Sequence, residues 1–387
     1  MLIYLTIILL LAFFYYHYDV SKAEKYKNVM YILACLAFIC VAGLRYRIGF
    51  DTINYMTDFY GPYFPKLSEF RFSTDYGGEV LWVLINATAK SIGGGFYTVQ
   101  FIQAIIVNVV VFWFLKKYSP RPFLAILLYF LFQWWNYCFE AMRESIAIAF
   151  YLFGLDALLS GKGLGRFYLR AWPAVFVHTF GFLVLLFPAI KYLKINKYLP
   201  FIVIGFIVFL VCVGDLVNNL LESMMGMQLD SDASSKMMKY MGDETYGEAN
   251  LSIFGIISLF ISRIIPIGCF AYVLHKNNKP ETDVFIPYLI MYIFMVGLRI
   301  AIPIFFRFFN YFEVMLIIAI TQAIDISPKK SFNRLLSVGM MGMMILIRSY
   351  ELTKPEGPSR AYNRYIPYNS VFTEDYNECS ESIFRFY

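Results

Sequence analysis

The sequence predicts an all-α, polytopic membrane protein, and three observations lead to this class. Of the 387 residues, 59% are hydrophobic and only 16% are charged. Apolar runs recur as far as residue 348 with no polar domain between them. Short basic loops separate these runs, as expected for the cytoplasmic loops of a membrane protein. We therefore expect residues 1–387 to form a single integral membrane domain with about 12 transmembrane helices, some of them short or re-entrant.

The composition also excludes several classes of protein. The net charge of +6 is spread over the loops, whereas nucleic-acid binding needs a dense basic patch, so we expect no nucleic-acid partner. The six cysteines lie mostly inside apolar runs and lack the CxxC spacing of a zinc site. The stretch Asp230-Ser-Asp232 has no apolar frame around it, and we interpret it as loop. We expect neither a metal nor a cofactor.

The first helices are placed by the charges of the loops. Residues 2–16 are apolar but lack the basic start and the cleavage site of a signal peptide, so they are expected to remain as a helix. The loop at residues 17–27 contains three lysines, which places it in the cytoplasm and the N-terminus outside. Residues 29–44 return to the outer face, where an external loop at about 45–96 follows. Within it, residues 79–92 are too few to span a membrane and predict an interfacial helix.

The next helices alternate between external turns and basic loops. Residues 97–115 lead to a basic loop in the cytoplasm, residues 122–138 lead outward, and residues 140–160 lead back to a second basic loop. The apolar residues 167–190 precede a further basic loop, and two crossings are needed to keep that loop cytoplasmic. We therefore divide this stretch near His178, which places His178 at the outer face.

The second half of the chain continues the alternation. Residues 199–214 lead out to an acidic, glycine-interrupted external loop at 215–252. The remaining transmembrane helices are expected at residues 253–274, 284–300, 308–325 and 335–348. The last of them ends outside, so the tail at residues 350–387 is expected to be external, like the N-terminus.

Charged residues gather at the outer ends of these helices, where charge is costly unless it has a partner or a function. The arginines at these ends are Arg45, Arg47, Arg143, Arg299 and Arg307. A guanidinium stays charged and presents a planar fork of donors, so several of them can bind a phosphate or diphosphate. We predict that these arginines meet on one face of the membrane and bind substrate, with Tyr55 and Tyr311 beside them.

A glycosyl transfer to such a substrate also needs a base near the acceptor hydroxyl. The candidates are Asp51, His178, Glu140 and Glu144. Simpler explanations exist for several of these residues. The glutamates could form local ion pairs with Arg143, His178 could be a hydrogen-bonded core residue, and Arg45 could extend to the interface from a helix end.

The same residues carry a resemblance to a known family. In order they are Arg45 and Arg47 with Gly49, Asp51 and Tyr55, then Arg143 at the start of an Ala- and Ile-rich helix, His178 before an apolar run, Arg307 with Tyr311, and the tail Tyr365-Ile-Pro-Tyr368. Over nearly the whole chain this arrangement resembles the EpsG-like family of bacterial exopolysaccharide polymerases, a Wzy-type group.

The resemblance implies a GT-C-like glycosyltransferase that uses no nucleotide sugar. It would transfer a growing glycan from undecaprenyl diphosphate to a lipid-linked repeat unit at the outer leaflet of the bacterial cytoplasmic membrane, for a capsule, O-antigen or other exopolysaccharide. Its partners would be the undecaprenyl-diphosphate-linked oligosaccharide, membrane lipid, and a flippase and chain-length regulator of the same pathway. The site would be formed by Arg45, Arg47, Asp51, Arg143, His178, Arg299 and Arg307.

Other functions also fit this membrane topology. A polyprenyl-linked-sugar glycosyltransferase usually has acidic residues in an external loop after its first helix, whereas this loop is short and basic. A membrane O-acyltransferase would need a clearer histidine-centred pair. A flippase or other transporter would carry charges near the bilayer midplane and show related halves, whereas these charges lie at helix ends.

Overall fold

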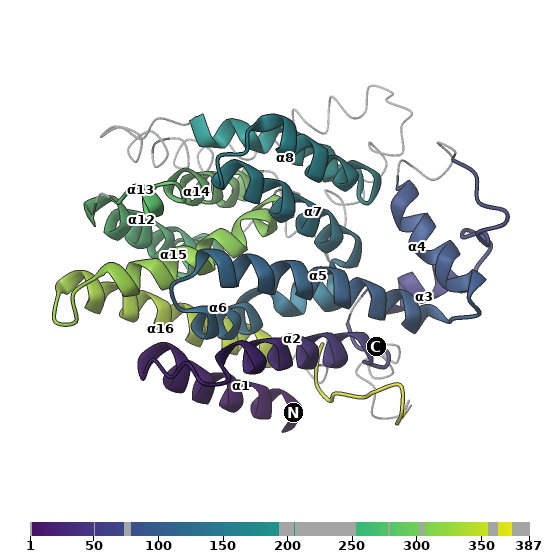
Figure 1. Cartoon of the computed structure of the whole chain (residues 1–387), viewed down its shortest axis with the longest axis horizontal. Helices are drawn as coiled ribbons and strands as arrows, with labels where there is room; N and C mark the ends of the chain where they lie inside the picture. Colours follow the sequence, from purple (N-terminus) through teal and green to yellow (C-terminus); the bar gives the residue numbers. More distant parts are fainter. Residues whose placement is uncertain are drawn as a thin grey trace. The chain divides into compact units, whose positions relative to one another are not determined.

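The chain folds into helices that form two compact units. The computed structural model describes residues 2–49, 51–72, 79–192, 205, 253–277, 279–301, 305, 307–354 and 363–373 (Figure 1). Every regular element in these residues is a helix, apart from one isolated antiparallel bridge, so the all-α prediction is confirmed. Unit 1 comprises Met1–Pro188 and Ile345–Tyr387, and unit 2 comprises Ala189–Met344.

Unit 1 contains the helices predicted for the first half of the chain. They are α1 (Leu2–Phe14), continued by η1 (Tyr15–Val20), α2 (Lys27–Gly43), α3 (Thr52–Tyr60), α4 (Val80–Ser91), α5 (Phe96–Tyr118), α6 (Pro122–Tyr129), η3 (Phe130–Trp134), η4 (Asn136–Glu140), α7 (Met142–Leu159), α8 (Leu164–Ala171), η5 (Trp172–Phe176) and η6 (Thr179–Tyr192), which extends past the end of the unit. The short helix predicted at residues 79–92 is α4. Helix α3 lies in a stretch predicted as loop, and it buries Thr52, Tyr55 and Phe59 at helical spacing.

Helix α5 lies between α2 and α7 in unit 1 (Figure 1). Two buried glutamines join it to its neighbours. Gln100 Nε2 donates to the carbonyl oxygens of Gly43 at 2.8 Å and Arg45 at 2.9 Å, and Gln103 Nε2 donates to Ser145 Oγ at 2.8 Å. Interhelical amide contacts of this kind hold helices together in a membrane. They fix the end of α2 and the start of α7 against the same helix.

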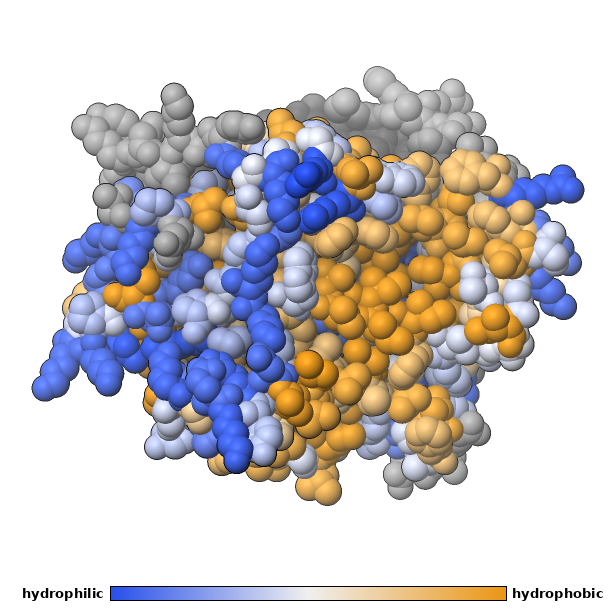
Figure 2. Space-filling view, viewed as in Figure 1, coloured by the Kyte–Doolittle hydropathy of each residue, from blue (hydrophilic) through white to orange (hydrophobic). Residues whose placement is uncertain are grey.

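Apolar side chains gather on the surface over α5 (Figure 2). Three large apolar residues of this helix are exposed at a spacing of one turn, namely Ile105, Val109 and Trp113. A contiguous apolar stripe of this kind is unusual on a water-soluble monomer and fits contact with lipid chains.

Five helices among the described residues are long and apolar enough to cross a membrane. They are Leu2–Val20, Phe96–Tyr118, Gly255–Asn277, Phe308–Ile326 and Phe332–Thr353. Shorter apolar helices of 10–17 residues occupy Lys27–Gly43, Pro122–Trp134, Thr179–Lys191 and Ile286–Arg299. All of these segments overlap predicted transmembrane stretches, which is consistent with a membrane protein. The predicted helix at 199–214 apart from Gly205, the loop at 215–252 and Asp230 with Asp232 lie outside the described residues.

After the last residues of η6, the next helices that the structure describes in unit 2 begin at Ile253. They are α11 (Ile253–Leu259), η7 (Phe260–Ile264), α12 (Ile265–Asn277), α13 (Pro280–Asp283), α14 (Ile286–Ala301), η9 (Phe308–Phe312), α15 (Glu313–Ile326) and α16 (Phe332–Thr353), whose last residues belong to unit 1. Helix α12 packs against both α14 and α15. This packing brings two charged residues together in the interior of unit 2, as described below.

Candidate functional site

One end of unit 1 brings together segments that are far apart in the sequence. Helices α3 and α4 contact α5 near its start (Figure 1). The loop after α2, the start of α7, the turn at His178 and part of the C-terminal tail meet at the same end, as the contacts below establish. Seven of the predicted site residues belong to this end: Arg45, Arg47, Asp51, Tyr55, Glu140, Arg143 and His178.

The loop after α2 has an unusual backbone that brings it close to the end of η4. Arg47 and Gly49 both have positive φ angles, of 51° and 104°. A Cβ atom on Gly49 would lie 2.6 Å from the carbonyl oxygen of Phe139, so only glycine fits. This close approach places the loop beside Glu140.

Replacing Gly49 with alanine is expected to lower the free energy of unfolding by about 1–3 kcal/mol, because the residue combines a positive φ with this close contact. Unfolding of the purified protein in detergent measures the loss. Gly165→Ala is the matched control, since a Cβ there would have nothing within 4 Å. Equal stability of the two variants would contradict the importance of the loop geometry.

Arg45 is fully buried and holds this loop from inside. Its Nη1 donates to the carbonyl of Ala42 at 2.6 Å and its Nε to that of Ile48 at 3.2 Å, while the guanidinium lies 4.6 Å from the ring centroid of Phe139. Burial lowers the pKa of Arg45 to about 10, so it remains charged at neutral pH. These contacts give Arg45 a role in positioning the loop, and its direct contact with a substrate phosphate stays a prediction.

Glu140 joins the loop to the C-terminal tail. Its Oε2 accepts a hydrogen bond from the backbone N–H of Asp51 at 3.4 Å, and its Oε1 lies 3.9 Å from Arg364 Nε. The tail is held nearby, because the N–H of Tyr46 donates to the carbonyl of Asn369 at 2.8 Å. The two predicted bases Asp51 and Glu140 are therefore neighbours, although they are far apart in the sequence.

Arg143 forms an ion pair with Glu79, the residue that precedes α4. The Arg143 guanidinium also lies 5.5 Å from the ring centroid of Tyr55, which is within the range of a cation–π contact. The other carboxylate oxygen of Glu79 accepts hydrogen bonds from Thr179 Oγ1 at 3.0 Å and Thr179 N at 3.4 Å. Arg143 is thus connected to α3, to α4 and to the turn at His178.

His178 lies in the break between two short helices, η5 and η6, at the position where this stretch was predicted to divide. The crossing of the membrane by each half stays a prediction. The chain turns sharply at the break and brings Gly181 against Ala174. A Cβ on Gly181 would lie 2.0 Å from the carbonyl oxygen of Ala174, so the turn needs glycine at this position. His178 is buried, and its Nδ1 accepts from the backbone N–H of Phe180 at 3.3 Å. This contact favours the tautomer in which a neutral His178 carries its proton on Nε2.

Asp58, on α3, is a further acidic residue near this cluster. Partial loss of hydration raises the pKa of Asp58 above its ordinary value, Arg143 opposes the rise and Glu79 adds to it. Asp58 and Tyr55 are one turn apart and share a helix face. The face of α3 that carries them therefore lies within electrostatic reach of the Arg143–Glu79 pair.

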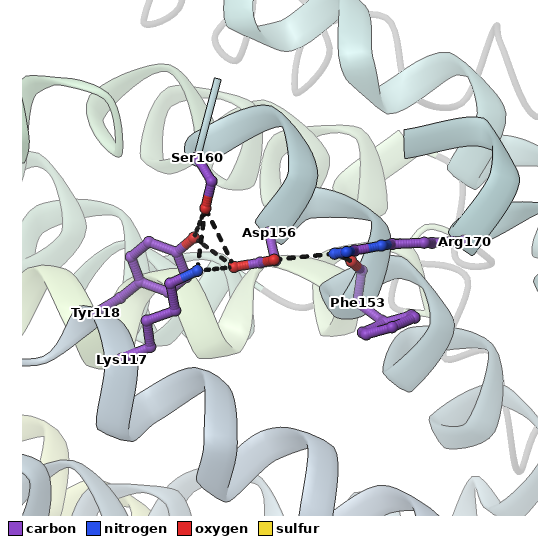
Figure 3. A network of polar contacts seen from close by, with 6 residues as sticks. All are labelled: Lys117, Tyr118, Phe153, Asp156, Ser160 and Arg170. Atoms are coloured by element: carbon purple, nitrogen blue, oxygen red, sulfur yellow. Dashed lines mark hydrogen bonds and ion pairs between the residues drawn. The ribbon is translucent and has the colours of Figure 1, made fainter. Parts of the chain in front are cut away.

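The opposite end of α7 carries a second polar network in unit 1 (Figure 3). Asp156 pairs with Lys117 on one side and with Arg170 at 2.9 Å on the other, and it accepts from Tyr118 OH at 2.9 Å. Arg170 also lies 4.5 Å from the ring centroid of Phe153. Arg143 and Asp156 lie on the same helix, and a rise of about 1.5 Å per residue places them about 20 Å apart along it. The candidate site and this basic network therefore lie at different ends of one helix.

The other predicted site residues belong to unit 2. Arg299 is half-buried near the end of α14, Arg307 is half-buried just before η9, and Tyr311 is buried within η9. The meeting of these three residues with Arg143 stays a prediction.

A buried ion pair lies among the same helices of unit 2. Arg263 pairs with Glu313 at 2.6 Å and with Tyr292, whose hydroxyl donates to Glu313 Oε1 at 2.5 Å. Tyr292 stacks on Phe309, and the Arg263 guanidinium lies 4.7 Å from the ring centroid of Phe309. These contacts connect η7, α14, η9 and α15.

The exposed apolar surface of the helices is that of a helical membrane protein. Its first unit carries a polar site at one end, formed by arginine, carboxylate and histidine side chains. The model of the EpsG family matches residues 28–370, and the protein belongs to this family. Membership indicates a role in exopolysaccharide polymerisation, a glycosyltransferase-like activity. No curated protein and no solved structure gives a significant match to the chain.

Several residues of the site were not predicted. Glu79 was assigned only as the first residue of an interfacial helix, although a carboxylate at the head of an apolar helix needs a partner. The same rule applies to Arg263 and Glu313, which lie inside apolar runs and could have been predicted to pair. Arg364 gave no such signal, because it lies in a polar tail.

Proposed function

We propose that this protein joins undecaprenyl-diphosphate-linked repeat units at the outer leaflet of the bacterial cytoplasmic membrane. The growing glycan would pass from its lipid diphosphate carrier to a lipid-linked repeat unit. The observation that supports this most is that Arg143, Tyr55, His178, Glu140 and Asp51 gather at one end of unit 1, where the backbone N–H of Asp51 donates to Glu140. Such a site offers a cation for the diphosphate and a base for the acceptor.

The reaction assigns distinct tasks to these groups. The acceptor hydroxyl attacks the anomeric carbon of the donor sugar, the bond from that carbon to the diphosphate breaks, and the hydroxyl proton passes to a base. The leaving diphosphate is a weak base, so it needs charge stabilisation more than a proton. We assign this stabilisation to Arg143, with Arg47, Arg299 and Arg307 as further ligands of the head group and Tyr55 and Tyr311 beside them.

The base is proposed among the carboxylates. With its proton on Nε2, a neutral His178 donates a hydrogen bond and suits contact with a substrate oxygen better than proton removal. Asp51 and Glu140 are neighbours and can act on one acceptor hydroxyl. We therefore propose one of these two carboxylates as the general base.

The two ends of α7 support the proposed orientation. Lys116, Lys117 and Arg121 lie at the end of α5 and in the loop after it, at the same end of unit 1 as Asp156. The positive-inside rule assigns this end to the cytoplasm. The candidate site would then face outward, with both termini on the same side.

We also propose the finer architecture that the family resemblance implies. A GT-C-like arrangement of about 12 crossings is supported by the apolar helices at the predicted positions, several of which are shorter than a full span. Assembly with a flippase and a chain-length regulator would supply the lipid-linked unit and limit the product.

Deleting the protein in its host tests the function directly. We expect single uncoupled repeat units to accumulate on the lipid carrier at the outer leaflet, measured by mass spectrometry of extracted lipid-linked glycans. Repeat units retained on the cytoplasmic side would indicate a flippase instead. Polymer of unchanged length that lacks acetyl groups would indicate an O-acyltransferase.

A further inference from the structure

Glu79 is the residue that joins the separate parts of the candidate site. Its side chain is 7% exposed, and both of its carboxylate oxygens are engaged. Oε2 pairs with Arg143 at the start of α7, and Oε1 accepts two hydrogen bonds from Thr179, next to His178. A single carboxylate thus connects the start of α4, the start of α7 and the start of η6.

The chemistry of a glutamate suits this connection. An ionised carboxylate accepts hydrogen bonds through both oxygens and can satisfy a guanidinium and a hydroxyl together. A glutamine side chain keeps one acceptor but loses the charge, and an aspartate is one methylene shorter. Neither replacement can hold Arg143 and Thr179 in the same arrangement.

The two partners differ in their access to a substrate. The Arg143 side chain is 34% exposed, whereas that of Glu79 is almost completely buried. A diphosphate can therefore approach Arg143, whereas Glu79 carries the same sign of charge as the diphosphate and has both oxygens taken by Arg143 and Thr179. The direct contacts of Glu79 therefore connect it to the reaction through Arg143 and through the turn at His178.

We propose that Glu79 is a positioning residue for the glycosyl transfer. It orients the Arg143 guanidinium toward the diphosphate and keeps the His178 turn beside it, without touching the substrate. This inference rests on the proposed function and adds a residue to its machinery.

A double-mutant cycle with Glu79→Gln and Arg143→Lys tests this role, using purified protein in lipid nanodiscs and its purified lipid-linked repeat unit. We expect Glu79→Gln to lower kcat by about 10- to 100-fold with KM within about threefold, because orientation acts on the transition state more than on binding. In the Arg143→Lys background, the same change should cost less than about threefold, because the group that Glu79 orients is already altered.

Asp156→Asn is the matched control. Asp156 is also a buried carboxylate that pairs with basic side chains, and it belongs to the opposite end of the same helix. We expect the Asp156→Asn and Arg143→Lys effects on kcat to multiply, even where Asp156→Asn lowers the unfolding temperature.

Thr179→Val provides a second test, since it keeps the ion pair and removes one hydrogen bond. Thr179→Val should lower kcat by about three- to tenfold in the wild-type protein, and this loss should be smaller in the Glu79→Gln background.

Two results would overturn the inference. One is a Glu79→Gln effect of equal size in both Arg143 backgrounds. The other, if Glu79→Gln does not fold, is a Thr179→Val variant with wild-type kcat. Failure of the proposed function would be seen separately, as a wild-type protein that neither extends the repeat unit nor binds undecaprenyl diphosphate in the same nanodiscs.

Discussion

Replacing Arg143 with lysine is expected to reduce polymer formation by about a hundredfold while the protein remains folded. Lysine keeps the positive charge but loses the planar fork, which pairs with Glu79 and faces Tyr55. The loss falls on the step in which the diphosphate leaves, where charge stabilisation contributes most. The initial rate of polymer formation from the purified lipid-linked repeat unit measures it.

Arg170→Lys is the natural control for this substitution. Arg170 also pairs with a buried carboxylate, Asp156, and lies over an aromatic ring, that of Phe153. Because it lies on α8, beside the end of α7 opposite to Arg143, we expect its replacement to change the polymerisation rate by less than about threefold. Equal losses in the two variants would show that arginine pairs stabilise unit 1 generally and would remove the functional role of Arg143.

Replacing Glu313 with leucine is expected to lower the free energy of unfolding by about 3–5 kcal/mol, because Arg263 would be left buried without its carboxylate. The double variant Arg263→Met with Glu313→Leu should recover at least about half of this loss, since two apolar side chains replace the pair. Tyr292→Phe removes the two hydrogen bonds of the hydroxyl but keeps the Arg263–Glu313 ion pair, and it should cost only about 1–3 kcal/mol. Unfolding of each variant in the same detergent measures these differences.

The comparison between single and double variants decides the role of the buried pair. Recovery in the double variant indicates that the cost of the single variant comes from an uncompensated charge. A double variant as unstable as the single one would contradict this interpretation. It would indicate that Glu313 contributes through other contacts of α15.

Most of the long apolar helices could be predicted from the sequence, because membrane helices have a strong signal. Apolar runs bounded by basic loops located α1, α5, α7 and α16 closely, and the lysines after residue 190 located the break at His178. Helix α3 was missed, because it is short and its buried residues are Thr, Tyr and Phe within a polar stretch. Helices that form only by packing on neighbours carry little signal of their own.

The site was predictable in its residue types but not in its pairing. Charges at helix ends pointed to Arg143 and Glu140, and a local ion pair between residues of one helix was the simplest alternative. The structure instead pairs Arg143 with Glu79, from a different segment. Arg45 was predicted as a ligand, yet its guanidinium donates to the carbonyls of Ala42 in α2 and Ile48 in its own loop. Such choices depend on tertiary contacts between distant segments, and loop charge alone does not contain that information.

The position of the lipid diphosphate in the folded protein is the most direct measurement of where the substrate binds. We expect a cryo-electron microscopy map of the protein in nanodiscs with undecaprenyl diphosphate to show the diphosphate within about 3 Å of the Arg143 guanidinium and beside Tyr55. The diphosphate would then lie at the end of α7 opposite to Asp156. A diphosphate bound instead at Lys117 and Arg170, or away from Arg143 altogether, would contradict the proposed site.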